Sequence, residues 1–298
     1  MTQNTNPVKT DKVTEIIANQ IIEQLENGVV PWHKPWVGVG TMWSRSTGKA
    51  YKAINQMLLN QNGEYATFNQ IVKEGGKVNK GAKGKIIIEY FCKARALTDE
   101  NGSPLLDDEG EQLVKKTFSK RYVRVFNIEH DTNLEIKHNK AVEYPENPIE
   151  ECEKVMGSYL TREKIKLTND DKDRAYYSPM MDYINLPEMK QFKEVSEYYS
   201  TAFHEMAHST GHSSRLNRKG FRDGEYAHFG DSTYSAEELI AEITSASIMN
   251  VLGVDTDKSF NNSVAYVESW LEALKNDKSM ILTASTFSDK AMAMILEG

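Results

Sequence analysis

The most constraining feature of the sequence is the pentapeptide His204-Glu205-Met206-Ala207-His208 inside residues 193–210, whose apolar pattern predicts one long helix ended by Gly211. A helix turns about 100° per residue, so side chains at i and i+4 lie on one face, one turn apart. His204 and His208 can therefore bind one zinc ion. Glu205 can then act as the general base toward a water molecule that the metal activates.

A third ligand is expected on the next predicted helix, residues 235–250. Glu238 and Glu242 share one of its faces, while its apolar residues point to a core. Carboxylates held near a core are costly unless a metal or histidine partners them. We predict Glu238 as the third metal ligand and Glu242 as the group that orients a ligand histidine, with Glu242 as the second choice of ligand. A solvated acidic face is the alternative.

Two further histidines, His212 and His228, follow the pentapeptide closely. His212 lies beyond the expected helix end, so we interpret it as a cap, as a group behind the ligands or as a substrate contact. The metzincin motif requires a histidine where this sequence has Ser214, so that class is excluded. A His-His-Glu set leaves one position for water, which is typical of catalytic zinc. Two incidental histidines on an amphipathic helix remain the alternative.

Length and composition indicate a globular protein of about two domains. The chain has 298 residues, 39% of them hydrophobic and 27% charged. Its apolar runs are far shorter than the roughly 20 residues that span a bilayer, and residues 1–12 are too polar for a signal peptide. Cys92 and Cys152 cannot form a disulfide framework. These features predict a cytoplasmic protein.

The net charge of -7 is divided unequally along the chain. Residues 1–140 carry 20 Lys and Arg against 16 Asp and Glu, whereas residues 141–298 carry 16 against 27. Such asymmetry favours a nucleic-acid or other polyanionic partner for the basic half. The bias is strongest between Lys49 and Arg95, where there are nine basic residues and three acidic ones.

The periodic patterns predict an α+β protein of two domains, the first at residues 1–135, a linker at 136–148 and the second at 149–298. The first half is predicted to hold a helix, two shorter helices and a hairpin with an acidic loop, at residues 14–25, 51–60, 67–74, 86–92, 98–112 and 118–127. The second half is predicted to be rich in helix, at residues 149–160, 193–210, 235–250 and 262–274.

Motifs in both halves resemble one family. The run from Tyr198 to His212, followed by Arg215-Leu216, Phe229-Gly230 and residues 234–242, is similar to the metallopeptidase domain of ArdC-type antirestriction proteins. The first half resembles that family's N-terminal domain, which TraC-type primases share, in Leu25-Glu26-Asn27-Gly28, Pro31-Trp32, Pro35-Trp36, Thr47-Gly48-Lys49-Ala50-Tyr51, Gly75-Gly76-Lys77-Val78 and Val125-Phe126-Asn127.

The resemblance implies a mixed α/β domain that binds single-stranded DNA, followed by a helix-rich zincin-like metallopeptidase domain with one Zn²⁺ or another divalent transition metal. It implies a protein of mobile genetic elements that protects incoming DNA from restriction, with host restriction components or a peptide as further partners. The alternatives are a protease whose main role is peptide hydrolysis and a non-catalytic accessory of conjugative replication. Ser209, where the family often has an aromatic residue, is expected to alter the wall of the pocket.

Single-strand binding without sequence preference needs cations for the phosphates and flat side chains for base stacking. We predict Trp43, Tyr51, Tyr65, Phe68 and Tyr122 as stacking candidates. For any one residue, a core aromatic or a solubilising lysine is the alternative. The residues predicted to bind DNA are Lys49, Tyr51, Lys52, Lys77, Lys80, Lys83, Lys85, Arg121 and Arg124.

Overall fold

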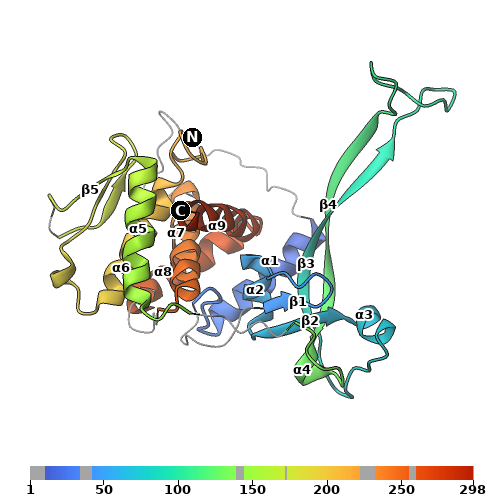
Figure 1. Cartoon of the computed structure of the whole chain (residues 1–298), viewed down its shortest axis with the longest axis horizontal. Coiled ribbons are helices and arrows are strands. Elements are labelled where there is room, and N and C mark those ends of the chain that lie inside the picture. Colours follow the sequence, from blue (N-terminus) through green and yellow to red (C-terminus); the bar gives the residue numbers. More distant parts are fainter. Residues whose placement is uncertain are drawn as a thin grey trace.

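The computed structural model describes residues 11–33, 42–138, 144–171, 173–221, 232–254 and 260–297, without the side chains of 232 and 260–266. The fold is α+β, as predicted, with a mixed first half and a helix-rich second half (Figure 1). None of the helices in these ranges combines the length and the apolar character that crossing a membrane requires.

The first half is built on a four-stranded sheet in the order β1-β2-β4-β3, with β1 and β2 parallel and the other pairs antiparallel. Helices α1 and α2 pack on it, and the short helices α3 and α4 lie at one end (Figure 1). The elements are α1 (Lys12–Glu26), β1 (Met42–Ser44), α2 (Ala53–Leu59), β2 (Gly63–Thr67), α3 (Phe68–Lys73), β3 (Lys85–Ala96), β4 (Val114–Asn127) and α4 (Ile128–Asp131).

Helix α1 forms where its apolar period predicts it. Asp11 caps its start by accepting hydrogen bonds from the backbone N–H groups of Val13 and Thr14. Its buried stripe includes Ile17 and Ile21, both fully buried. The predicted helices at 51–60 and 67–74 are likewise confirmed as α2 and α3.

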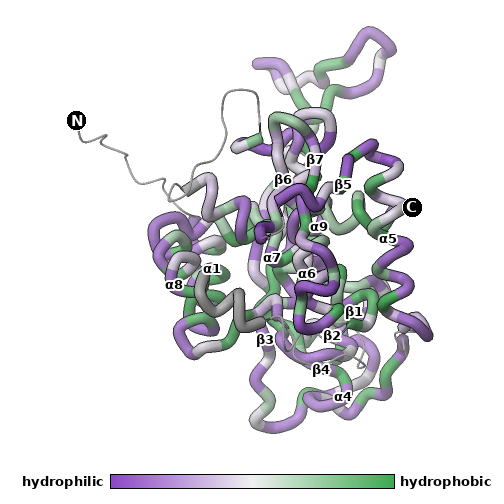
Figure 2. Tube along the Cα trace, turned by 90° about the vertical axis from the view of Figure 1, so that its left-hand side faces the viewer, coloured by the Kyte–Doolittle hydropathy of each residue, from purple (hydrophilic) through white to green (hydrophobic). Residues whose placement is uncertain are grey.

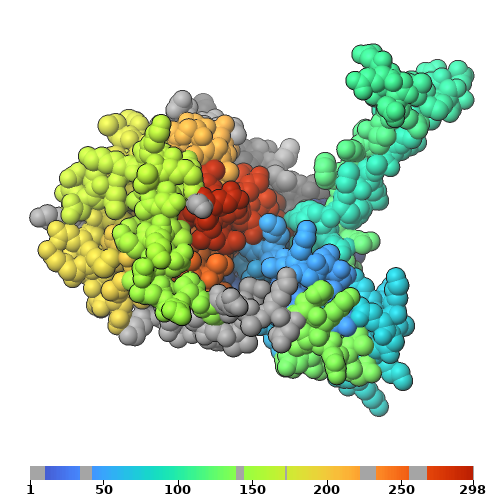
Figure 3. Space-filling model, viewed as in Figure 1, coloured from blue at the N-terminus to red at the C-terminus, as the bar shows by residue number. Residues whose placement is uncertain are grey.

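The predicted hairpin is confirmed, but it is longer than its pattern suggested. Strand β2 pairs with β4 only from Val125 to Asn127, so the outer parts of β3 and β4 form a two-stranded ribbon. This ribbon extends away from the rest of the molecule (Figures 1 and 3). At its tip the backbones of Leu97, Leu105 and Leu113 form a ring of hydrogen bonds of 2.8–3.0 Å.

The second half contains five described helices, and a small sheet in the order β5-β7-β6 lies against α6. Helices α6 and α7 lie side by side, and α9 packs on α7 (Figure 1). The elements are α5 (Pro148–Glu163), β5 (Lys166–Thr168), β6 (Tyr176–Ser178), β7 (Tyr183–Asn185), a 3-10 turn at Met189–Gln191, α6 (Val195–Ser209), α7 (Ser232–Val251), α8 (Phe260–Asn276) and α9 (Met280–Leu296).

One hydrophobic core joins the two halves. It contains buried side chains of α1, α2 and β3 together with side chains of α7, α8 and α9. Trp32 of the first half meets Trp270 of α8 edge to face, with ring centroids 5.3 Å apart. The predicted linker between the halves lies at 136–148, of which residues 139–143 are outside the described residues. The shared core shows that the two halves are in direct contact, wherever along the chain the boundary between them falls.

Candidate metal centre

Helix α6 presents two different faces. Its apolar face buries Tyr199, Phe203 and Met206 in the core of the second half, which fixes the rotation of the helix. That rotation turns His204 and His208 towards α7, which packs alongside. The period of the apolar residues therefore decides where the two imidazoles point.

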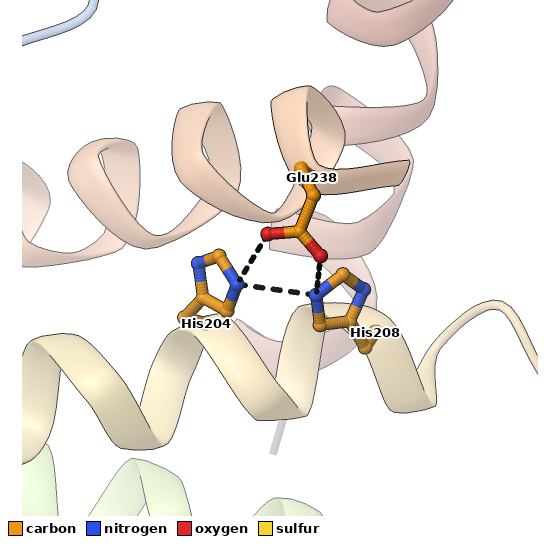
Figure 4. A group of neighbouring side chains, drawn as sticks. All are labelled: His204, His208 and Glu238. Carbon is orange, nitrogen blue, oxygen red and sulfur yellow. Dashed lines mark hydrogen bonds and ion pairs between the residues drawn. The ribbon is translucent and has the colours of Figure 1, made fainter. Parts of the chain in front are cut away.

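Three side chains converge between these helices (Figure 4). The Nε2 atoms of His204 and His208 are 3.1 Å apart. The two carboxylate oxygens of Glu238 on α7 each lie 3.5 Å from one of these nitrogens. One donor atom from each residue lies within 4.8 Å of the other two, and this is the group in the described part of the chain that could hold a metal ion.

The charges around the histidines favour a cation. Burial disfavours charge on His204, but Glu238, Glu205 and Glu242 outweigh it and raise its pKa to about 9. Burial likewise opposes ionisation of Glu238, yet the hydrogen bonds to His204 and His208 hold its pKa well below the ordinary value. The three glutamates thus make the site anionic, so a positive charge held between His204, His208 and Glu238 would be stabilised.

The donor set fits a divalent metal. Two imidazoles and a carboxylate are typical ligands of catalytic zinc, and the facing Nε2 atoms are brought closer together than two protonated nitrogens would prefer. Glu242 lies behind the site, with a carboxylate oxygen 4.0 Å from Nδ1 of His204. Glu205, next to His204, is 8% exposed. The Nδ1 atom of His208 is buried without a hydrogen-bond partner among the described residues.

A buried arginine ties the two helices of the site together, and sequence reasoning missed it. Arg218 is 2% exposed and donates to both carboxylate oxygens of Glu237, the neighbour of Glu238, at 2.8–3.0 Å. It also donates to Thr210 Oγ1 and to the carbonyl of Ala207 at the end of α6. One side chain therefore fixes the end of α6 against the start of α7.

Matches to two known domains run in order along the chain. Residues 11–126 match the N-terminal domain of anti-restriction factor ArdC, and residues 154–287 match a zincin-like metallopeptidase domain. A crystal structure of the metal-free antirestriction protein ArdC from plasmid R388 covers 96% of this chain and 97% of its own, with a TM-score of 0.71 and 29% identity. The chain thus combines an ArdC-type N-terminal domain with a zincin-like metallopeptidase domain.

Two further proteins are similar to this chain over nearly its whole length. The Mn(II)-bound form of R388 ArdC matches with a TM-score of 0.69 and 28% identity, over 96% of this chain and 98% of its own. An uncharacterised protein of Sinorhizobium fredii, y4eC, is 26% identical over 96% of this chain and 92% of its own length. Of the two R388 structures, one therefore holds Mn(II) and the other is free of metal.

Two DNA primases named TraC from Escherichia coli are each 34% identical over 95% of this chain. The chain spans only 20% of one and 27% of the other. The similarity therefore concerns one part of those larger proteins.

The remaining residues predicted near the site have other partners. His212 shares a hydrogen bond of 2.8 Å with Ser214 just beyond α6. Arg215, from the motif that follows, forms an ion pair with Asp182, which also accepts a hydrogen bond from the hydroxyl of Tyr177. Ser209, where the resemblance raises the question of a changed pocket wall, is fully buried and shares a hydrogen bond with the hydroxyl of Tyr159 on α5. His228 and Phe229-Gly230 lie outside the described residues.

The predicted DNA-binding residues are dispersed over the first half. Lys85 is half-buried and donates to the carbonyl of Leu59, and burial lowers its pKa. Tyr51 is partly buried, edge to face with Tyr65. The other predicted basic residues are exposed, namely Lys49, Lys52, Lys77, Lys80, Lys83, Arg121 and Arg124.

The stacking candidates divide into buried and exposed rings. Trp43 and Tyr65 are 5% and 1% exposed, so their prediction as stacking residues is wrong, because both rings belong to the core of the sheet. Phe68 and Tyr122 are 53% and 48% exposed. Sequence reasoning missed two more exposed rings on the ribbon, Phe118 and Tyr90. The alternation of Phe118 with Lys116 and Lys120 along β4 was a signal that could have identified that ring.

Proposed function

We propose that this chain is an antirestriction protein of a mobile element, which binds single-stranded DNA through residues 1–135 and carries a zinc site in residues 149–298. In this role it acts in the cytoplasm, where incoming DNA meets restriction enzymes. The observation that carries the proposal is the ordered pair of domain matches on one chain, together with the full-length likeness to an antirestriction protein. The similarity to DNA primases supports the DNA-binding part.

The metal part of the proposal assigns His204, His208 and Glu238 as ligands. A zinc ion held there would supply Lewis acidity and lower the pKa of a bound water. Glu242 would keep the ring of His204 in orientation from 4.0 Å. Glu205 would hold and return the proton exchanged during hydrolysis. Glu205 is 8% exposed, and a largely buried position suits a carboxylate in that task.

Three measurements test the proposal. Metal analysis of the purified protein should find one zinc per chain, lost in His204→Ala. A mobility shift should show binding to single-stranded oligonucleotides that weakens as salt is raised, because released counterions drive such binding. A plasmid carrying the gene should enter a restricting host more efficiently than one that lacks it. Absence of binding at low salt would refute the DNA-binding role.

Peptide hydrolysis is the second candidate, favoured by the convergence of His204, His208 and Glu238 beside Glu205. The substitution Glu205→Gln separates the two roles, because it removes the proton acceptor and keeps the proposed ligands. If the variant retains zinc and protects the plasmid fully, hydrolysis is dispensable for antirestriction. If protection is lost while zinc and DNA binding are retained, hydrolysis is part of the protective mechanism.

A further inference from the structure

The outer ribbon has two unlike faces. Residues paired across an antiparallel ladder lie on the same face, and the register pairs Ile88 with Tyr122, Tyr90 with Lys120 and Cys92 with Phe118. We call the face that carries these pairs the aromatic face. Its three rings, Tyr90, Phe118 and Tyr122, are 58%, 81% and 48% exposed.

On the opposite face of the ribbon, the aromatic ring and some of the charged side chains already have partners within the chain. The side chains of Lys93 and Arg121 lie over the ring of Phe91, with Lys93 Nζ and Arg121 Cζ each 5.4 Å from the ring centroid. Arg121 donates through two nitrogens to Glu89, which stands directly across from it. The aromatic face differs because its rings remain open to solvent.

Charge on the ribbon is segregated along its length. Strands β3 and β4 together carry eight Lys and Arg residues and one carboxylate. The tip, residues 97–113, carries six Asp and Glu and no basic residue, and it is largely purple at the top of Figure 2. The exposed rings thus lie on the basic strands β3 and β4, where a polyanion would bind.

Large exposed rings within a basic surface match the chemistry of single-stranded nucleic acid. Each base offers a flat face to an aromatic ring, while lysines balance the phosphates. On β4 the rings of Phe118 and Tyr122 alternate with Lys116 and Lys120, so rings and cations share one face. Lys116 is exposed there, whereas Lys120 is already paired with Asp11. Duplex DNA keeps its bases stacked inside the helix, where these rings cannot reach their faces.

At the base of the ribbon the same surface opens into a pocket of about 460 Å³. It lies where β2 stops pairing with β4, between the start of α3 and the unpaired edge of β4. Phe68 and Tyr122 line it together with Arg121 and Arg124. Tyr122 and Arg124 bring the aromatic face to this pocket, while Arg121, paired with Glu89, reaches it from the opposite face.

We infer that the aromatic face of the ribbon, Tyr90, Phe118 and Tyr122 with Lys116, is the surface on which bases of single-stranded DNA stack. The inference rests on the proposed DNA-binding function and names its site. It places the main contacts with DNA on strands β3 and β4 of the ribbon, rather than on the dispersed lysines elsewhere in the first half. Most of these residues were not among the sequence-based candidates.

A native cysteine provides the first test. Cys92 is exposed on the aromatic face, directly across from Phe118. Cys152 is fully buried, and burial raises its pKa to about 12, so it should not compete. Alkylation of Cys92 by iodoacetamide should slow severalfold when oligothymidylate is added, and less with duplex of the same length. Equal protection by the duplex would overturn the inference.

Truncation of single rings provides the second test. Phe118→Ala and Tyr122→Ala should each weaken binding to oligothymidylate by roughly 5- to 150-fold, the usual range for one stacked base. Leu106→Ala is the matched control, because Leu106 is 56% exposed on the same hairpin but lies at the acidic tip. It should leave binding unchanged. The dependence of binding on salt should stay the same in all three variants, since no charge is removed.

An abasic oligomer of the same length isolates the role of the bases. All three variants should bind it as the wild-type protein does, because phosphate contacts remain and stacking is absent. If Phe118→Ala and Tyr122→Ala bind oligothymidylate as tightly as the wild type, the stacking site is wrong and the DNA-binding function stands. If the wild type binds no single-stranded DNA at low salt, both the function and the site are refuted.

Discussion

At the scale of single residues, the two glutamates of α7 test the metal centre. Glu238→Gln should abolish tight zinc binding, because it removes the carboxylate that faces both Nε2 atoms at 3.5 Å. Glu242→Gln should weaken zinc binding by only about 10- to 100-fold, since it removes a group behind His204. Competition with a chromophoric chelator measures both affinities. The reverse order of effects would make Glu242 the ligand.

The buried pair of Arg218 and Glu237 gives the second prediction at this scale. Arg218→Met leaves the Glu237 carboxylate buried without its cation, which should lower the free energy of unfolding by about 3–5 kcal/mol. Zinc affinity should fall with it, because α6 and α7 lose their common anchor. Urea unfolding measures the first effect and chelator competition the second. The double variant Arg218→Met with Glu237→Leu is the control and should recover part of the stability, since no charge is left buried.

The sequence predicted the residues of the site that one helix can specify. His204, Glu205 and His208 follow from the helical repeat, and so does the common face of Glu238 and Glu242. Arg218 could not be predicted, because its partner lies 19 residues further along the chain. Only the packing of α6 on α7 brings the two together.

At the scale of elements, the cap of α1 predicts a dependence on pH. Burial tends to raise the pKa of Asp11, but its hydrogen bonds with Lys120 and Thr14 outweigh this and lower it to about 2. A pKa below the ordinary value of about 4 means that the carboxylate stabilises the folded state at neutral pH. This contribution is lost as the pH falls from about 4 to about 2.

Asp11→Ala should therefore lower the free energy of unfolding by about 1 kcal/mol at pH 7, which is typical of a lost cap. The ion pair with Lys120 adds little, since the Asp11 side chain is 54% exposed. The difference from the wild type should shrink towards pH 2 in urea unfolding. Asp11→Asn keeps a capping side chain and should cost less. A difference that is independent of pH would contradict the role of the charge.

The acidic tip of the ribbon gives a prediction about an element as a whole. Replacing residues 98–112 with Asn-Gly should keep the ribbon, because Asn-Gly forms the two-residue turn that antiparallel strands favour. The change removes six carboxylates and should tighten binding to oligothymidylate at low salt, with a smaller gain at high salt. Fluorescence anisotropy measures both. Weaker binding would show that the tip itself contacts DNA.

The elements that the sequence predicted are those with clear patterns. The hairpin followed from alternation and from Gly102 and Gly110 in its loop. Strand β2 was not predicted, although it lies inside the sheet. The reason is Glu64, which is fully buried within β2 and paired with Arg45, and which interrupts the apolar run. A charged residue in a central strand is recognised only when its distant partner is known.

At the scale of the whole molecule, the two halves should unfold together. Length and the composition around Pro145 and Pro148 predicted two domains, and each amphipathic helix predicted an inward face. Periodicity cannot say which partner that face meets. In the structure α1 and α2 turn theirs onto α7, α8 and α9, so the first half and the half with the candidate metal centre share one core. Zinc bound to one half should therefore stabilise the other.

The substitution Trp270→Ala tests this coupling. Trp270 is 1% exposed between the halves, and its removal should cost about 3–5 kcal/mol. Hydrogen exchange should then rise in peptides from α1 as well as from α7, because both border the cavity that is left. Met180→Ala, at a position 74% exposed, is the control and should change neither. In the wild type, zinc should slow exchange in both halves. Protection confined to α6 and α7 would mean that the halves open independently and that binding of metal does not reach the DNA surface.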